Sequence, residues 1–69
     1  MKSLREIRTE LGLSQRKLAK LAGILQPNIV VMERNNLQGT TIGTVSRLAE
    51  AMGCRAIIHG GAVFFEKNV

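Results

Sequence analysis

The segment Gln15–Arg34 constrains the fold of this chain more than any other part of the sequence. Apolar or small side chains recur in it at helical spacing, at Leu18, Ala19 and Ala22 and then at Ile29 and Met32. Gly23 stands between the two runs, where a left-handed residue that ends a helix costs glycine little. The small Ala19 permits two helices to cross closely and steeply through a short turn. The segment therefore predicts two short helices joined at Gly23 and packed at a steep angle.

Two further helices are predicted by capping and turn residues on either side of this pair. Ser3 followed by Glu6 forms a capping-box pattern, in which each residue satisfies an amide of the other at a helix start. Residues 35–39 have the composition of a turn, and Thr40 or Thr41 suits the N-terminal cap of the helix that follows. The expected helices run from Leu4 to Gly12, from Ser14 to Gly23, from Gln26 or Pro27 to Arg34 or Asn35, and from Thr40 or Thr41 to Gly53.

The last part of the chain, residues 54–69, changes from helical to strand-like composition. Two β-prone apolar runs flank Gly60 and Gly61, a dipeptide that suits a two-residue hairpin turn. This turn would place apolar side chains on both faces of the ribbon, with Ala56, Ile58, Val63 and Phe65 on one side and Ile57 and Phe64 on the other. The helices can cover one face, but a two-stranded ribbon with a second exposed apolar face is not expected to be stable alone.

A second copy of the hairpin would cover that second face, so the sequence favours a homodimer. The residues expected in the dimer interface are Ile57, Ile58, Val63, Phe64 and Phe65. The alternative is a monomer whose hairpin folds loosely over its own helices. We therefore expect a helical domain at residues 1–53 and a dimerisation hairpin at residues 54–69.

Length and charge restrict the classes of protein that remain. The chain has 69 residues, enough for one small domain. Ten lysines and arginines oppose five glutamates, and the net charge of +5 suits a polyanionic partner, although a solvated basic face has the same composition. The N-terminus is charged and no apolar run is long enough to cross a bilayer, so we expect a soluble, cytoplasmic protein that contacts no membrane.

Enzymatic and metal chemistry have few candidate residues. Cys54 and His59 are the only cysteine and histidine, and on one strand they would point to opposite faces. Aspartate is absent, a single cysteine can form no internal disulfide, and no Cys/His cluster has the spacing of a zinc site. We therefore expect neither an enzyme nor a bound metal or cofactor.

Short motifs along residues 4–53 stand in the same register as those of a known family. They are Leu13-Ser14-Gln15, Leu18-Ala19, Gly23, Gln26-Pro27, Ile29, Glu33-Arg34 and Leu48-Ala49-Glu50-Ala51-Met52-Gly53. With this set the chain resembles the Cro and phage-repressor type of helix-turn-helix domain (XRE-like), a large group of small prokaryotic DNA-binding regulators. The resemblance implies a mainly α, lambda-repressor-like DNA-binding domain of four to five helices, here followed by a short C-terminal β-hairpin.

The resemblance also implies which side chains contact double-stranded DNA, because the second helix of the motif lies in the major groove in this family. By that resemblance the base-contacting residues are Gln26, Asn28 and Val31, with amides that can pair with adenine and a valine suited to a thymine methyl group. The residues expected at the phosphate backbone are Gln15, Arg16, Arg34, Asn35, Asn36 and Gln38, with Thr40 or Thr41. Gln15 could also brace Gln26. The alternative for residues 35–38 is an ordinary polar turn.

Glu33 is implied to have a structural role. A carboxylate that faced DNA would repel phosphates, and similar proteins pair this glutamate with an arginine of the first helix, here Arg8. Without Arg8, the half-buried charge of Glu33 would be left unpaired.

The chain departs from the family pattern at three positions. Leu25 stands where the family usually has a serine or threonine that caps the recognition helix, and such a cap contributes about 1 kcal/mol. Val30 and Val31 stand where polar or basic residues are common. Either the target is rich in thymine at these positions, or the surface has partly turned to protein binding.

The sequence thus predicts a sequence-specific DNA-binding transcription regulator, a repressor that acts as a homodimer on an inverted-repeat operator. The alternative is an antitoxin, or another protein-interaction module, of a toxin-antitoxin pair that also regulates its own operon. In that case the apolar hairpin would hold the toxin. A second alternative is a structural protein on a borrowed fold, which would show little salt dependence in any binding to DNA.

Overall fold

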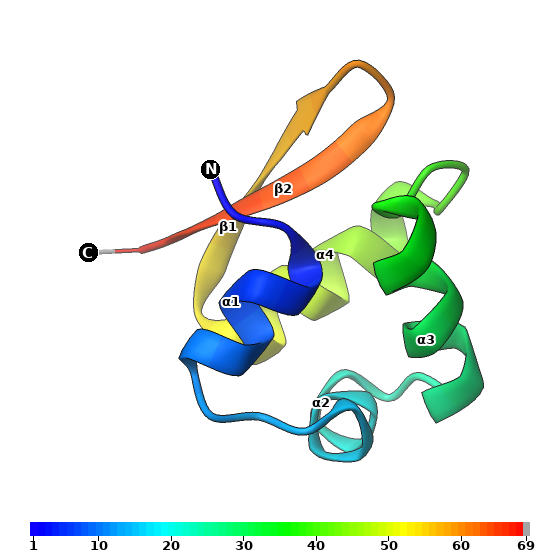
Figure 1. The fold of residues 1–69 in the computed structure, drawn as a ribbon, viewed down its shortest axis with the longest axis vertical. Coiled ribbons are helices and arrows are strands. Elements are labelled where there is room, and N and C mark those ends of the chain that lie inside the picture. The colour runs from blue at the N-terminus through cyan, green and yellow to red at the C-terminus, as the bar shows by residue number, and fades with distance from the viewer. Residues whose placement is uncertain (69) are drawn as a thin grey trace.

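The structure is a computed structural model, and it describes residues 1–68 as four helices followed by one antiparallel hairpin (Figure 1). The helices are α1 Leu4–Glu10, α2 Gln15–Ala22, α3 Gln26–Asn35 and α4 Ile42–Met52, and the strands are β1 Cys54–His59 and β2 Ala62–Lys67. The mainly α fold with a C-terminal hairpin, as predicted from the sequence, is confirmed. No helix in the described part of the chain is long and apolar enough to span a membrane.

Polar side chains determine where three of the helices start. Ser3 and Glu6 form the predicted capping box: the Glu6 N–H donates to the Ser3 hydroxyl (3.1 Å) and the Ser3 N–H donates to the Glu6 carboxylate (2.9 Å). Ser14 caps α2 by accepting from a first-turn amide (2.9 Å). Thr41, rather than Thr40, caps α4. These caps satisfy amides that have no partner inside a helix.

The turn after α3 contains an unexpected core residue. Asn36 and Leu37 both lie in the left-handed region, with φ of 54° and 62°. Asparagine tolerates that region, but leucine rarely enters it. The Leu37 side chain is 1% exposed and packs in the core, so its burial offsets the strain of the turn. The sequence predicted only a polar turn here.

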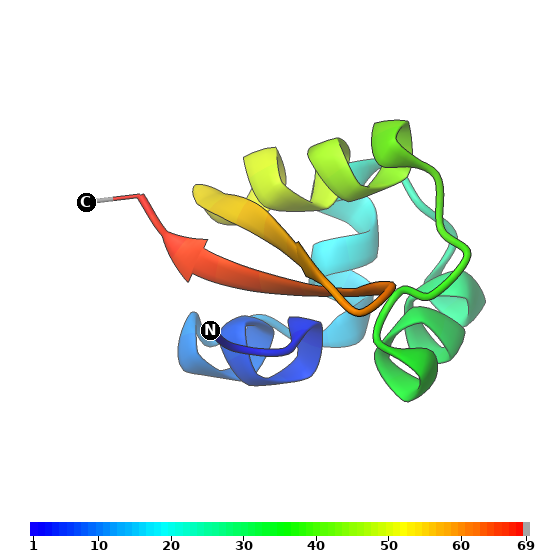
Figure 2. The same ribbon diagram turned by 90° about the horizontal axis from the view of Figure 1, so that it is seen from above.

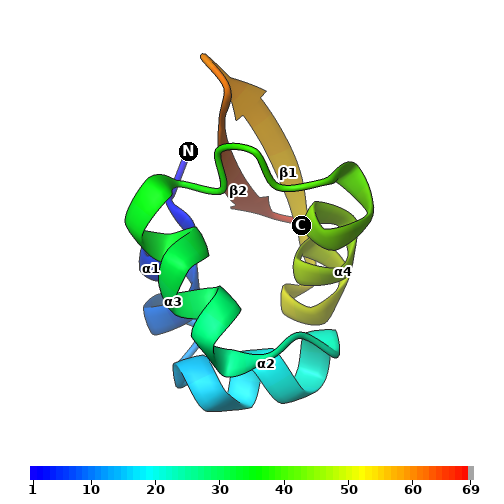
Figure 3. The same ribbon diagram turned by 90° about the vertical axis from the view of Figure 1, so that its right-hand side faces the viewer.

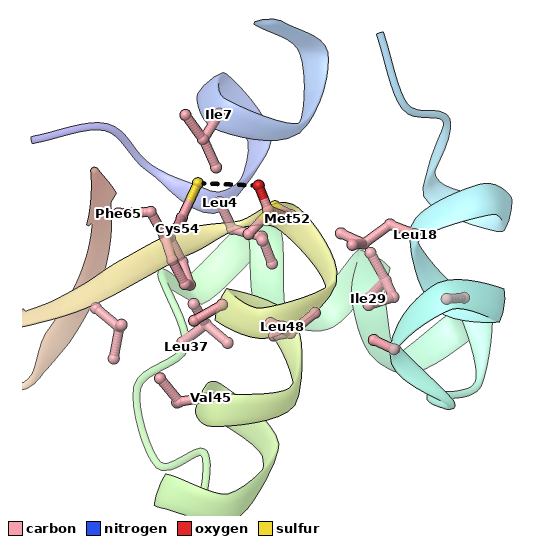
Figure 4. Packing of buried hydrophobic residues seen from close by; sticks show 14 residues of the cluster. Leu4, Ile7, Leu18, Ile29, Leu37, Val45, Leu48, Met52, Cys54 and Phe65 are labelled. Carbon is pink, nitrogen blue, oxygen red and sulfur yellow. Dashed lines mark hydrogen bonds between the residues drawn. The ribbon is translucent and has the colours of Figure 1, made fainter. Parts of the chain in front are cut away.

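One apolar core joins all four helices to the hairpin (Figure 4). Leu18 of α2, Ile29 of α3 and Leu48 of α4 are fully buried in it. Phe65 of β2 is fully buried as well, so the hairpin completes the core of the helices rather than standing apart from it. The other buried members are Leu4, Ile7, Ala19, Ala22, Leu37, Val45, Ala49, Met52, Cys54 and Val63.

The hairpin has the predicted turn and the predicted register. Gly60 and Gly61 have φ of 60° and 82°, as in a type I′ turn, whose twist matches that of the paired strands. Ile57 lies opposite Phe64. The pairing is continuous, without a bulge, from Cys54 opposite Lys67 to His59 opposite Ala62.

The strand β2 is hydrogen-bonded along both of its edges. On one edge it pairs with β1. On the other edge Lys2 and Phe65 exchange two backbone hydrogen bonds (3.1 and 2.7 Å), and the Val63 N–H donates to the Asn36 carbonyl (3.0 Å). Seen from above, the hairpin passes between α1 and α4 (Figure 2). The N-terminus and the turn after α3 therefore both hold β2 in place.

Candidate nucleic-acid interface

The helices α2 and α3 form the packed pair predicted from the sequence. Gly23 follows α2 with φ of 67°, and the Ile24 N–H donates to the Ala19 carbonyl (2.9 Å), so the chain reverses direction before α3. Figure 3 shows α3 toward the viewer with α2 crossing its lower end. Only Ile29 of α3 is fully buried, which leaves most of this helix at the surface.

The outward side of α3 carries the side chains expected at base edges. The exposed residues of the helix are Gln26, Pro27, Asn28, Val31, Arg34 and Asn35. Gln26 and Asn28 place two amide groups in the first turn of the helix, and each amide offers both a donor and an acceptor. Val31 follows Asn28 at helical spacing and is 50% exposed. All three residues are therefore accessible at the N-terminal part of α3, where Asn28 and Val31 share a side of the helix and Gln26 lies on another.

The start of α3 has no side-chain cap, as the departure at Leu25 predicted. Leu25 is the capping residue and is 72% exposed. However, Pro27 has no amide proton to be capped, and the Asn28 N–H donates to the Leu25 carbonyl (3.0 Å). The missing side-chain cap therefore costs less here than the usual value of about 1 kcal/mol.

A buried polar network attaches α3 to the two preceding helices. Arg8 donates from Nε to Glu33 Oε2 (2.5 Å), from Nη2 to Glu33 Oε1 (3.2 Å) and from Nη1 to the Leu13 carbonyl (2.7 Å). The pairing implied for Arg8 and Glu33 is therefore present. Gln15 donates from Nε2 to Glu33 Oε1 (3.0 Å), so within the described residues it braces Glu33 and not Gln26.

Glu33 remains charged although it is almost inaccessible to water. Its side chain is 6% exposed and that of Arg8 is 10% exposed. Burial alone would raise the pKa of Glu33, because a carboxylate loses its hydration there. Hydrogen bonds from Arg8 and Gln15, and the positive charges of Arg8 and Arg5, outweigh burial and hold the pKa of Glu33 below its ordinary value. Glu33 therefore anchors α3 as a carboxylate.

A cationic hollow of about 620 Å³ lies where α1, the start of α2 and α3 meet. Its lining residues are Arg5, Arg8, Ser14, Gln15, Val30, Glu33 and Arg34. Because Arg8 neutralises Glu33, the net positive charge comes from Arg5 and Arg34. The hollow also borders the N-terminus of α2, where the free amides and the helix dipole favour an anion. A DNA phosphate has the charge that suits this hollow.

Arg5 was not among the residues expected from the sequence. A signal was available, because Arg5 and Arg8 lie three residues apart and share a face of α1. Since Arg8 was assigned to a contact with the recognition helix, its neighbour on the same face was a candidate too. Only the structure brings that face of α1 against α3 and Arg34.

The residues expected at the phosphate backbone surround the ends of α2 and α3. Arg16, Arg34, Asn35 and Gln38 are exposed, whereas Gln15, Asn36 and Thr40 are partly buried. Asn36 also has a structural role, because its carbonyl accepts the Val63 N–H. The Thr41 hydroxyl is occupied in capping α4, which makes Thr40 the better candidate of the two threonines.

Two of the residues expected in a dimer interface belong to the core of the subunit itself. Val63 and Phe65 are 4% and 0% exposed, so they cannot contact a second subunit without leaving their own core. Sequence reasoning placed them at the interface because it could not tell which part of the ribbon the helices cover. Ile57 and Phe64 are half-buried and Ile58 is 66% exposed, which leaves these three accessible to a partner.

Cys54 and His59 lie in separate surroundings. Cys54 is buried, its thiol donates to the Met52 carbonyl (3.4 Å), and burial raises the pKa of the thiol. His59 is exposed beside the hairpin turn. Among residues 1–68, no group of three or more His, Cys, Asp or Glu side chains is arranged to hold a metal ion.

The family model for helix-turn-helix domains matches residues 4–57 of the chain. The matched range runs from the start of α1 into β1 and contains the whole of the α2–α3 pair and every residue that lines the cationic hollow. No curated protein matches the chain.

Proposed function

Because the chain belongs to the Cro/C1-type helix-turn-helix family of DNA-binding transcription regulators, we propose that it is a repressor that binds an inverted-repeat operator as a homodimer. One observation carries the proposal: the exposed N-terminal part of α3, with two amides and a valine, stands beside a cationic hollow. In a symmetric dimer, two such faces would read half-sites whose centres are about one helical turn, or a multiple of it, apart.

In this proposal the first turns of α3 read base edges in the major groove. The amides of Gln26 and Asn28 each match the donor and acceptor that adenine presents there. Val31 has no polar atom in its side chain, so its contribution is apolar contact with a thymine methyl group. These three residues determine which operator is preferred.

The phosphate contacts fix the position of the protein on the duplex. Arg5 and Arg34 bind a phosphate at the cationic hollow, which the charge of the hollow supports. The remaining backbone contacts in the proposal are Gln15, Arg16, Asn35, Asn36, Gln38 and Thr40. They supply affinity that depends on salt and little on sequence.

The experiment that tests these roles is selection of bound fragments from random duplexes, followed by affinity measurements on the selected operator and on an unrelated duplex. Gln26→Ala and Asn28→Ala should reduce the ratio of the two affinities. Arg34→Ala should weaken binding to both duplexes by the same factor, and should reduce the slope of log affinity against log salt by about 1. Arg47→Ala, a change at an exposed arginine of α4, is the matched control and should change neither quantity.

The outcomes separate the parts of the proposal. Equal losses on both duplexes from all three substitutions would overturn the assignment of base-reading residues. Affinity that barely changes between low and moderate salt would overturn DNA binding through phosphates. A reporter promoter that contains the selected operator should be less active in the presence of the protein, and increased activity would overturn repression.

The antitoxin alternative is favoured by one observation, the exposed Ile58 on the hairpin. In that case the apolar surface would hold a toxin instead of a second copy. Light scattering distinguishes the two readings: we expect a dimer at tens of micromolar, and a monomer at that concentration would favour the alternative.

A further inference from the structure

The outer edge of β1 carries backbone groups that have no partner among residues 1–68. In an antiparallel pair, residues alternate between those that bond to the neighbouring strand and those that point away from it. The backbone groups of Val63 and Phe65 are bonded on the far edge of β2, to Asn36 and Lys2. Their opposite residues on β1, Ile58 and Ala56, must therefore direct their N–H and C=O groups away from β2.

Nothing within residues 1–68 bonds to these outward groups of Ala56 and Ile58. Both residues are exposed, and Ile58 is 66% exposed. The outer half of the hairpin projects beyond the helices (Figures 1 and 3). Cys54, the next outward-facing residue toward the helices, is buried. The free edge is therefore a short stretch, Ala56–Ile58, with four unpaired backbone groups and no neighbouring element to cover it.

We infer that the β1 edge of a second copy of this chain pairs antiparallel with this edge, with the two Ile57 residues facing each other. This inference rests on the homodimer of the proposed function and specifies how it forms. Ala56 of each copy lies opposite Ile58 of the other, and each such pair exchanges two backbone hydrogen bonds. All four free groups of each copy are then satisfied, and the two hairpins form one four-stranded antiparallel sheet.

The composition of β1 suits a second copy as the occupant of this edge. The strand has no acidic residue and no lysine, and its one arginine, Arg55, is neutralised by Glu66 of the same hairpin (2.6 Å). Two copies can therefore approach without charge repulsion. The side chains of Ile57 and Phe64, half-buried in one copy, come beside those of the other copy on the outer face, which adds apolar contact between subunits. The two-fold axis is perpendicular to the sheet, so the helices of both copies lie on the same face of it.

Disulfide cross-linking tests this register directly and needs no DNA. The two Ile57 residues would lie directly opposite each other without exchanging hydrogen bonds. The Cα atoms of such a pair are about 4.5 Å apart, which is within the range of a disulfide. In a Cys54→Ala background, Ile57→Cys should give a disulfide-linked dimer on mild oxidation. Ile58→Cys is the matched control, because the two Ile58 residues are diagonal neighbours about 7–8 Å apart and should cross-link poorly. Absence of cross-linking through Ile57→Cys, or equal cross-linking at both positions, would overturn the inference.

A second variant tests the hydrogen bonds of the edge. Ala56→Pro removes an N–H that points away from β2, so the hairpin should survive while the dimer dissociation constant rises at least about tenfold. Ala56→Ser keeps the N–H and should leave the dimer unchanged. Sedimentation analysis measures association, and circular dichroism checks that each variant is folded. A folded Ala56→Pro variant that still dimerises as tightly as the parent would overturn edge pairing, whereas cross-linked dimers that bind no DNA would overturn only the proposed function.

Discussion

Arg8 and Glu33 are the pair of residues on which the position of the recognition helix depends most. The two charges are nearly inaccessible, and in the described part of the chain Gln15 is the one further side chain that donates to Glu33. Arg8→Met would leave a buried carboxylate without its cation, and we expect it to lower the free energy of unfolding by about 3 kcal/mol. The double change Arg8→Met with Glu33→Leu removes both charges and should cost less than Arg8→Met alone. Urea denaturation measures both, and a double variant that is the less stable of the two would contradict this account.

The same pair predicts how stability changes with acid. Since the pKa of Glu33 is lower in the folded protein than its ordinary value of 4.5, its contribution to stability is complete above that value. The contribution is lost as the pH falls through the lower pKa of the folded state, because the unfolded chain then binds a proton that the folded protein does not. Glu6, Glu10 and Glu66 also have lowered pKa values, so the parent protein alone does not isolate Glu33. The parent should lose stability below about pH 4.5 more steeply than the double variant, measured by urea denaturation at each pH.

Val31 is the residue where an apolar contact is expected to read the operator. Replacing thymine by uracil removes one methyl group and leaves every hydrogen-bonding group of the base in place. At a base that Val31 contacts, this change should weaken binding about fourfold, since burial of one methyl group contributes about 0.8 kcal/mol. The Val31→Ala variant should bind the thymine operator more weakly than the parent does, and its affinity should change little when thymine is replaced by uracil. Fluorescence anisotropy measures each affinity, and a parent protein that is insensitive to uracil at every position of the half-site would exclude this contact.

At the scale of elements, the helices differ in how their starts are stabilised. Ser14 satisfies an amide of α2 with its side chain, whereas Leu25 gives α3 only its carbonyl. Ser14→Ala should therefore lower the free energy of unfolding by about 1 kcal/mol, and Leu25→Ala should cost almost nothing through capping. Chemical denaturation of the two variants makes the comparison. A loss from Leu25→Ala as large as that from Ser14→Ala would mean that the exposed leucine stabilises α3 in another way.

The hairpin is an element whose role depends on which of its faces meets the helices. Its turn and register follow from Gly60 and Gly61, because a two-residue turn determines which residues lie opposite each other. The faces do not follow from the turn. Val63 and Phe65 are buried, whereas Ala56 and Ile58, which lie opposite them on the same side of the ribbon, are exposed. Among residues 1–68, β2 is flanked by β1, Lys2 and Asn36, whereas β1 is the outer strand. The predicted interface therefore included two residues that belong to the core.

At the scale of the whole molecule, the helices and the hairpin are expected to unfold together. Phe65 is fully buried among side chains of the helices, and Phe65→Ala should cost about 3–5 kcal/mol. A domain of this size has little more stability than that, so the helices should lose their structure together with the strands. Phe64→Ala, on the opposite and half-buried side of the ribbon, is the control and should cost much less. Thermal unfolding is measured by circular dichroism. A Phe65→Ala variant whose helices stay folded after the hairpin has unfolded would contradict unfolding as one unit.

The residues that sequence reasoning located correctly are those whose positions depend on near neighbours. Ser3 with Glu6, Ser14 and Gly23 are set by hydrogen bonds and backbone preferences within a few residues, so helix limits could be predicted. The burial of Leu37 and the partner of Gln15 could not, because each depends on contacts with segments far away in the chain. A leucine in a left-handed turn becomes a core residue only when a core exists to receive it.

The sequence by itself determined the helices, the α2–α3 pair with its outward amides, and the register of the hairpin. These features depend on periodicity and turn chemistry, which act over a few residues. Tertiary structure alone decided that Arg5 joins Arg34 at the cationic hollow, and that Lys2 and Asn36 occupy one edge of β2 and leave β1 as the free edge. Backbone groups and charges from distant segments meet only after the core has formed, so no local pattern records them.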